Sequence, residues 1–365
     1  LGRSDEESEG NTNIQLGRVR VNLTPNPFTN GLPFNQTLDL ATGRILITAG
    51  APGSQTRLQV WVDANHPVIH VTGNSDASVS VSASYEMDLR SLNTATSIAD
   101  AQQGDYVLND GASAITWYHR NRASAFYNNL SSEGLYQSLA TIQDPIMNRT
   151  FGGRMSGSGL VRSGTQAIAS SAAGTNIDLA IDVNAGVYAT ATNWQSDLNA
   201  LAVARASRDL AADLAAHEAW WSNFWQRSYL NLGGPAETRL ISKYYADQRF
   251  INACTTRGTY PTPFNGSTLT MDRPVGYPSF FGISSSAQNA DYRDWNGNRI
   301  FWQNTRHIYW PMLISGDFDL TEQLSRYCRN ILPICRERAQ VWENNPGMLM
   351  PEGLGVGGDC VFGRS

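Results

Sequence analysis

The hydrophobic pattern changes its period near Trp194, and this change sets the expected fold class. From Ile14 onward the chain carries short segments that alternate in polarity or are β-branched, each bounded by Pro, Gly, Asn or Asp. From residue 196 to residue 225 the chain is rich in Ala and Leu, lacks Gly and Pro, and repeats its apolar residues at helical spacing. The sequence therefore predicts a multidomain protein with a β part followed by an α part.

The β part is expected to form an antiparallel β-sandwich over residues 14–195, because many short strands separated by turn signals are typical of that architecture. Residues 1–13 are polar and acidic, and we expect them to be disordered. The segments that we predict as strands are 14–23, 44–48, 58–62, 68–71, 78–85, 115–119, 153–161 and 177–183.

The helical part begins with one long predicted helix in a linker of residues 196–232, and Ser196 with Asp197 supplies its expected N-cap. We interpret His217 near the end of this run as structural. Residues 258–299 form a long loop in which many aromatic residues argue against disorder. We interpret Trp220, Trp221 and Trp225 as packing between domains, and we predict further helices at 237–256, 301–315 and 320–343.

Composition excludes several classes of partner. The net charge is −5, only 16% of the residues are charged, and there is no basic run, so we expect no nucleic-acid partner. No apolar stretch reaches the roughly 18 residues of a membrane span, so we expect no membrane partner. The sequence does not indicate an oligomeric state.

The cysteines do not predict a metal site, because none forms a Cys-x-x-Cys pair and no His lies nearby at ligand spacing. We expect no metal and no cofactor. Cys328 and Cys335 share a helix face about two turns apart, too far for a disulfide. Cys360 is expected either to pair with one of them or to be a buried free thiol like them.

The compartment is indicated only by composition. Ser, Thr, Asn and Gly are plentiful, and five Asn-x-Ser/Thr sequons occur, which favours a secreted or extracytoplasmic protein. No signal peptide is visible, because the chain begins with an acidic segment.

Residues 289–311, NADYRDWNGNRIFWQNTRHIYWP, combine aromatic rings with amides, guanidinium groups and carboxylates. Sugars stack their apolar faces on rings and need convergent polar groups for their hydroxyls, so this mixture predicts a sugar-binding cleft. The alternative is an amphipathic helix with one aromatic face. The candidate substrate-binding residues are Asp291, Trp295, Arg299, Trp302, Arg306, His307, Tyr309 and Trp310.

The segments HEAWWSNFWQRS, QRF, FNG, WQNTRHIYWP and MPE follow one another in this order along the helical part. In type and order they resemble the barrel segment of the α-L-fucosidase-like glycoside hydrolases of family 95. The chain is more similar still to uncharacterised relatives of that family, in which LDLATGRI, VWVDANHPVIHV, WYHRN and NRTFGG mark the N-terminal β domain. All four of these motifs stand in this sequence.

The resemblance implies an N-terminal β-sandwich, a helical linker and an (α/α)6 barrel whose chemistry is inverting glycoside hydrolysis. It implies that Glu352 is the general acid and that Asn304 is the second member of an Asn pair that positions the water, with a nearby carboxylate. Asp294 is our candidate for that carboxylate. Trp302 stands where the fucosidases carry the first Asn, so the resemblance favours a glycosidase more than a fucosidase.

The residues themselves allow the same chemistry. Inverting hydrolysis needs an acid and a base about 6.5–9.5 Å apart. Asp291 and Asp294 flank Trp295, whose ring could desolvate them, although each could instead cap a turn. Glu352 follows an apolar segment, which suits an acid, although it could also be a solvated loop residue.

Two geometric points concern the predicted helix at 301–315. Trp302 and Asn304 would lie about 200° apart around one helix, so both cannot face the same sugar. Either the segment before Arg306 is loop, or only one of the two residues faces the cleft, and we favour the loop. Arg299 and Arg306 are expected either to bind sugar hydroxyls or to pair with the nearby aspartates.

The length of the helical part limits what it can form. A barrel of twelve helices needs well over twice residues 233–365, so we expect an incomplete barrel with exposed apolar helix faces. The predicted function is a glycoside hydrolase that acts on a side-chain sugar of a plant or microbial polysaccharide or oligosaccharide, with the chain alone weakly active or inactive. The alternative is a non-catalytic carbohydrate-binding protein. A phosphorolytic enzyme would need an anion site, and no compact Arg/Lys/Ser cluster supplies one.

Overall fold

The computed structural model describes residues 16–86, 106–108, 111–262 and 300–360. The predicted disordered segment 1–13 and the candidate site residues Asp291, Asp294, Trp295 and Arg299 lie outside the described residues.

The N-terminal half is a large antiparallel β structure, as the alternating pattern predicted. Along its main sheet the strands are ordered β2-β3-β4-β5-β11-β8-β7-β6, while β1 and β10 pair with β5, and β9 pairs with β10. Its strands are β1 (Arg18–Thr24), β2 (Phe34–Asp39), β3 (Arg44–Ala49), β4 (Thr56–Val62), β5 (Val68–Glu86), β6 (Tyr106–Leu108), β7 (Ala114–Arg120), β8 (Arg149–Ser156), β9 (Leu160–Arg162), β10 (Ala167–Ser170) and β11 (Gly174–Val187).

Strand β5 connects the main row of strands, from β2 to β6, with a smaller group formed by β1, β10 and β9. Its first half pairs with β4 and β11, and its second half pairs with β1 and β10. The main apolar core contains side chains from both groups, among them Leu23, Val81, Ile115 and Leu179. The two separate strands predicted at 68–71 and 78–85 are therefore one continuous strand.

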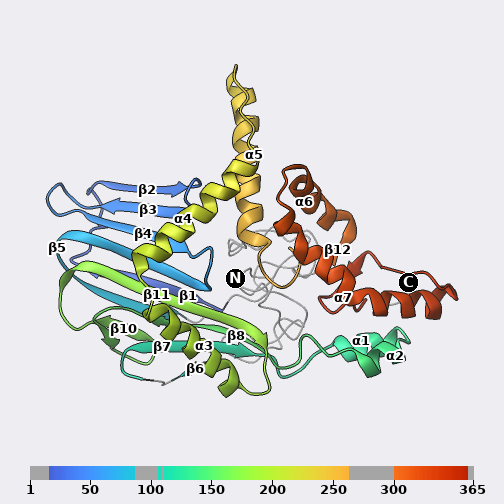
Figure 1. Ribbon diagram of the computed structural model, residues 1–365. Coiled ribbons are helices and arrows are strands. Elements are labelled where there is room, and N and C mark those ends of the chain that lie inside the picture. The colour runs from blue at the N-terminus through green and yellow to red at the C-terminus, as the bar shows by residue number, and fades with distance from the viewer. Residues whose placement is uncertain (1–15, 87–105, 109–110, 263–299, 361–365) are drawn as a thin grey trace.

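The predicted single helix from Ser196 is wrong, because two helices occupy this region. Helix α3 (Ala191–Ala206) begins five residues earlier than expected, where the Thr190 side chain accepts a hydrogen bond from the Asn193 N–H. Helix α4 (Leu210–Arg227) begins after a break at which the Asp209 side chain accepts from the Ala211 N–H. Both helices cross one side of the β structure (Figure 1).

The remaining helices agree closely with the predicted ranges. They are α5 (Ala236–Thr255), α6 (Trp302–Ile314) and α7 (Phe318–Glu343), with a short two-stranded pair of β12 (Ile300–Phe301) and β13 (Gly353–Leu354). Two short helices that the sequence did not predict, α1 (Phe126–Ser132) and α2 (Tyr136–Thr141), leave the β structure and pack beside α7 (Figure 1).

A buried ion pair fixes that contact. Arg338 Nε of α7 donates to Glu133 Oε2 at 2.6 Å, and both side chains are fully buried. The second oxygen of Glu133 accepts from the Cys360 N–H at 2.8 Å. The α1–α2 insertion, α7 and the C-terminal segment therefore share one satisfied polar centre.

The aromatic end of α4 packs between the β and helical parts, as interpreted from the sequence. Trp221 lies in an apolar cluster with Ile308 of α6 and Ala253 of α5, while the Trp225 Nε1–H donates to the Leu40 carbonyl oxygen. His217 is structural too: its Nδ1 accepts from the Ala64 N–H and its Nε2 donates to the Thr42 carbonyl oxygen. Burial lowers the pKa of His217, which favours this neutral arrangement.

Some of the described helices expose apolar side chains to solvent. Helix α5 extends away from the rest of the molecule (Figure 1), and Ile241 and Tyr244 on it are more than half exposed. At the end of α6, Ile314 is 89% exposed. The (α/α)6 toroid stays a prediction. None of the described helices is long and apolar enough to cross a bilayer.

None of the four cysteines forms a disulfide, and Cys335 of α7 lies with Cys360 in one buried apolar cluster. Burial raises the pKa of both Cys328 and Cys335.

Candidate functional site

The candidate site is the N-terminal end of α6, where the C-terminal segment brings Glu352. Strands β12 and β13 pair Ile300 with Leu354 and Phe301 with Gly353. The pairing continues as the Trp302 N–H donates to the Glu352 carbonyl oxygen at 3.1 Å. The Glu352 Oε1 then accepts from the Gln303 N–H at 2.8 Å. Glu352 therefore caps α6 through a side chain that lies 49 residues further along the chain.

This position gives the Glu352 carboxylate a particular environment. The side chain is exposed, and its carboxylate lies at the N-terminal end of α6, where it accepts from a backbone N–H that has no acceptor within the helix. An exposed carboxylate differs from the buried one expected of a general acid with a raised pKa. The role of Glu352 as the acid stays a prediction.

One face of α6 displays rings and a cation to solvent. Trp302 is 37% and Trp310 is 49% exposed. The Arg306 guanidinium lies over the Trp310 ring at 5.2 Å from its centroid, and His307 meets the same ring edge-on at 5.8 Å. Rings held by such contacts offer stacking surface beside a charged donor, which is the chemistry a sugar face and its hydroxyls require.

The helix begins at Trp302, so the expected loop before Arg306 is wrong. The β12–β13 pairing and the Glu352 cap start the helix early because they fix its first residues. Asn304 is half-buried, on a different side of α6 from Trp302. Trp302 and Asn304 therefore do not face one common point.

Tyr309 does not belong to the exposed face. It is 2% exposed, its hydroxyl accepts from the Thr262 N–H at 3.0 Å and donates to Gln323 Oε1 at 3.3 Å, and burial raises its pKa to about 12. The side chain connects α6, α7 and the segment after α5. Its expected place among the sugar-binding residues finds no support in this geometry.

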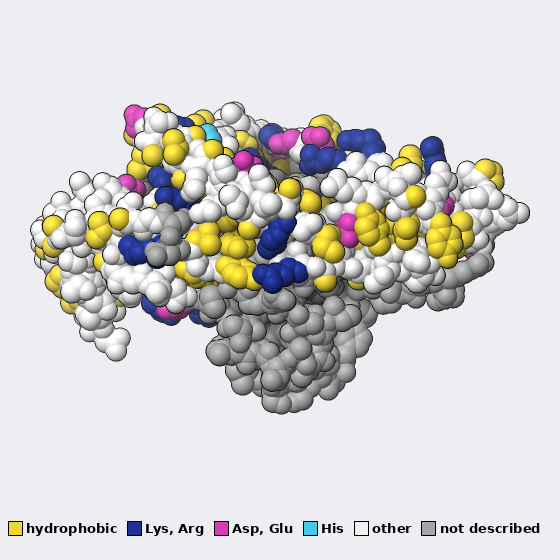
Figure 2. Space-filling view, turned by 90° about the horizontal axis from the view of Figure 1, so that it is seen from below, with side chains coloured by type: hydrophobic (Ala, Val, Ile, Leu, Met, Phe, Trp, Pro, Cys, Tyr) yellow, Lys and Arg dark blue, Asp and Glu magenta, His cyan; other side chains and the backbone are white. Residues whose placement is uncertain are grey.

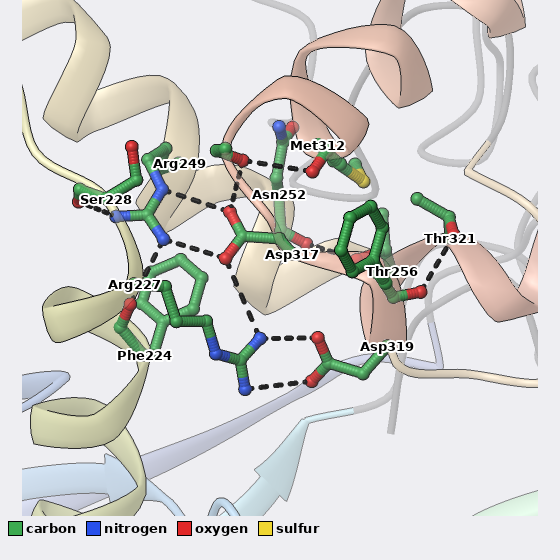
Figure 3. Close-up of polar contacts among 12 residues, drawn as sticks. Phe224, Arg227, Ser228, Arg249, Asn252, Thr256, Met312, Asp317, Asp319 and Thr321 are labelled. Atoms are coloured by element: carbon green, nitrogen blue, oxygen red, sulfur yellow. Dashed lines mark hydrogen bonds and ion pairs between the residues drawn. The ribbon is translucent and has the colours of Figure 1, made fainter.

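A buried charged centre fixes the turn from α6 to α7 (Figure 3). Asp317 accepts from Arg249 Nε at 3.0 Å and Nη2 at 2.8 Å, and from the Ser315 hydroxyl at 2.6 Å. The Arg249 guanidinium also donates to the Phe224 and Ser228 carbonyl oxygens and lies over the Phe224 ring. This centre joins α4, α5 and the α6–α7 turn, and so it holds α6 in place from the end opposite Glu352.

Sequence reasoning did not identify this centre or a second polar cluster under α4. Asp63, His66 and Asp213 place metal-ligand atoms within 4.8 Å of one another. However, Asp63 is engaged with the Asn65 and His66 N–H groups and the His66 ring, and Arg208 Nε donates to both oxygens of Asp213. Carboxylates that are already paired in this way are poor ligands for a cation. The only sequence signal was the presence of Asp63 and His66 in the VWVDANHPVIHV motif.

The surface charge agrees with the composition on the face shown in Figure 2. There, Lys and Arg side chains are dispersed among hydrophobic and acidic ones and do not form one basic band.

The fold has a counterpart of known structure. A chain described as "Putative kojibiose phosphorylase from human microbiome" superimposes with a TM-score of 0.54 over 95% of this chain, at 14% sequence identity. At this identity the likeness shows the fold alone. This chain spans 43% of the length of that chain.

The family follows from the sequence. Residues 1–230 match the family described as "Domain of unknown function (DUF5703)", in its N-terminal domain. The chain therefore belongs to the DUF5703 family. A search of curated proteins gave no match.

Proposed function

We propose that this chain carries part of the active site of a carbohydrate-active enzyme, and that the enzyme is an inverting glycoside hydrolase. The observation that carries the proposal is the contact between the Glu352 carboxylate and the start of α6, beside the exposed rings of Trp302 and Trp310. The fold likeness to a protein described as a phosphorylase of a sugar supports the same substrate class. The resemblance to family 95 supports hydrolysis.

In this proposal Glu352 protonates the leaving oxygen, while a carboxylate about 6.5–9.5 Å away activates water. Trp302 and Trp310 stack on the sugar, and Arg306 and His307 bind its hydroxyls. Asp294 remains our candidate for activating the water, whereas Asn304 lies on a different side of α6 from Trp302 and has no assigned role at the sugar that Trp302 contacts. We also propose a secreted or extracytoplasmic location.

The test compares Glu352→Gln with Glu322→Gln, an exposed carboxylate on α7 that serves as the matched control. Both variants are made in the 365-residue chain and in a longer polypeptide that contains it, and each is assayed on a panel of nitrophenyl glycosides. Glu352→Gln should abolish turnover by a longer polypeptide and keep sugar binding, while Glu322→Gln changes neither. Proton NMR of the first-formed anomer should show inversion.

Three results would contradict the proposal. Undiminished turnover in Glu352→Gln would remove this residue from the chemistry. Binding without turnover in any length of polypeptide, unchanged by Glu352→Gln, would assign a non-catalytic sugar-binding protein. Turnover that depends on added inorganic phosphate would identify a phosphorylase instead of a hydrolase.

A further inference from the structure

A polar pocket lies where the turn between α3 and α4 meets the β structure. Its volume is about 330 Å³, which is at the lower end of the range for small-molecule sites. The side chains that matter for its chemistry are His70 of β5, Ser158, Asp178 of β11, Arg205, Arg208 and Asp213. All of these lie within the part of the chain that matches the DUF5703 family.

Two groups on the wall of this pocket lack hydrogen-bond partners. His70 is 2% exposed, and neither of its ring nitrogens has a partner. Arg208 Nη2 is buried without a partner as well. A buried polar group left unpaired costs about 1–3 kcal/mol, so each instance calls for an explanation. Among the described residues, these are the two pocket-lining side chains with such atoms.

The His70 ring is held in place by packing instead of by hydrogen bonds. It stacks on Trp61 with the ring centroids 4.1 Å apart and an interplanar angle of 18°. Burial lowers the pKa of His70 to about 4, so the ring is neutral at physiological pH and offers one donor and one acceptor.

The pocket has no excess of positive charge, because two guanidinium groups lie among three carboxylates. Arg205 Nε donates to both oxygens of Asp182 at 2.9 and 3.1 Å, and Arg208 Nε donates to both oxygens of Asp213 at 3.1 and 2.8 Å. Asp178 adds one further carboxylate. A small anion would therefore meet no net positive charge, and a metal cation would meet two guanidinium groups. A neutral ligand with several hydroxyls suits these walls.

We propose that this pocket binds a neutral polyhydroxylated ligand the size of one sugar ring, with hydrogen bonds to the His70 ring and Arg208. A second pocket of about 280 Å³ shares Ser158 and Asp178 with the first. A second sugar unit would extend into it, so an oligosaccharide is the preferred ligand. The site is built from the β part and the α3–α4 turn, and it does not depend on the chemistry proposed for α6.

The test measures sugar binding by saturation-transfer NMR and isothermal titration. The probes are glucose, galactose, xylose and L-fucose with their β-linked disaccharides, and inorganic phosphate and calcium chloride are tested separately. His70→Phe keeps the ring stacked on Trp61 and removes both nitrogens. Ser158→Trp fills the exposed mouth of the pocket without changing the core. Ser54→Trp, at an exposed turn that lines neither pocket, is the matched control.

We expect at least one of these sugars to bind, with affinity reduced about tenfold or more in both pocket variants and unchanged in Ser54→Trp, as loss of one or two hydrogen bonds implies. His70→Phe should keep or raise the melting temperature of the ligand-free protein and lose the shift that sugar induces. If His70→Phe fails to fold, Ser158→Trp decides the result.

The proposal is overturned if no probe sugar binds, if phosphate or calcium binds in place of sugar, or if sugar binds equally to the wild type and Ser158→Trp. Binding lost in Trp310→Ala but kept in Ser158→Trp would place the sugar on α6, and would overturn this proposal while leaving the proposed function intact. Binding lost in Ser158→Trp and kept in Glu352→Gln would support the pocket whatever the fate of the proposed enzyme.

Discussion

Replacing Arg249 with Met should destabilise the helical part of the protein more than any nearby charge removal. Arg249 is 4% exposed and Asp317 is 2% exposed, so the substitution leaves a carboxylate in the interior. Removing one partner of a buried ion pair costs about 3–5 kcal/mol. Asp317 keeps the Ser315 hydroxyl at 2.6 Å and an Arg227 nitrogen at 3.6 Å, which places the expected loss near 3 kcal/mol.

Arg227→Met is the matched control, because it removes a guanidinium from the same cluster (Figure 3). The Arg227 side chain is 30% exposed, and its closer partner, Asp319, is half exposed. Exposed pairs of this kind contribute about 0–1 kcal/mol, so the control should lose less than 1 kcal/mol.

Urea unfolding followed by tryptophan fluorescence measures both losses, since Trp221 and Trp225 report on the same cluster. A loss of 3 kcal/mol lowers the midpoint by about 1–3 M at typical m-values. The double variant Arg249→Met with Asp317→Leu should recover most of the loss, because an apolar pair can replace a buried ion pair. Equal midpoints for the two single variants, or no recovery in the double variant, would refute this reasoning.

Three further predictions concern other parts of the molecule. Gly43→Ala should lower the free energy of unfolding in urea by about 2 kcal/mol or more, because φ is +62° and a Cβ would lie 2.1 Å from the buried Trp221 Nε1. The control Gly31→Ala, at φ +86° with no atom nearby, should lower it by about 1 kcal/mol, and equal losses would contradict this reasoning. Burial lowers the pKa of His70 from 6.5 to about 4, so between these pH values the unfolded chain binds a proton that the folded chain does not. The free energy of unfolding should therefore fall by up to roughly 3 kcal/mol as the pH drops from 6.5 to 4. In unfolding measured across this pH range, His70→Phe should remove most of that dependence. Ile314→Lys should reduce light scattering from aggregates and the binding of a hydrophobic dye, with the urea midpoint unchanged, because Ile314 is 89% exposed. Unchanged scattering would show that another surface causes the aggregation.

The β part and the boundaries of α5, α6 and α7 could be predicted because local pattern and tertiary structure agree there. Strand β5 is a place where they differ. Residues 73–77, GNSDA, are typical of a turn, yet they stay extended because β4 pairs with Gly73, Asn74 and Ser75, and Arg57 binds the Asp76 carboxylate. A Cβ at Gly73 would lie 2.0 Å from the Arg57 carbonyl oxygen, so the glycine allows a close backbone contact instead of a turn.

The helix break at residues 207–209 was missed for a related reason. The run lacks Gly and Pro, and its apolar spacing continues through the break. The Asp209 side chain nevertheless caps α4, and Arg208 turns to Asp213. The site at α6 was predictable in residue type only. That Glu352 caps α6 depends on a pairing across 49 residues, and no local pattern reports such a contact.

The buried polar groups of this protein differ in whether they have hydrogen-bond partners within the chain. We use this difference to distinguish groups that stabilise the fold from groups that are candidates for binding a ligand. His217 and His70 are both buried beside Trp61, yet His217 uses both ring nitrogens and His70 uses neither. Arg338, in the C-terminal half, is as buried as any residue and places all three guanidinium nitrogens on acceptors. Groups that serve the fold are thus paired within the chain, even where the partner is distant in sequence. The unpaired atoms of His70 and Arg208 belong to side chains that line one pocket, and pairing them within the chain would have stabilised the fold more. Their lack of partners is therefore consistent with the ligand site that we propose there.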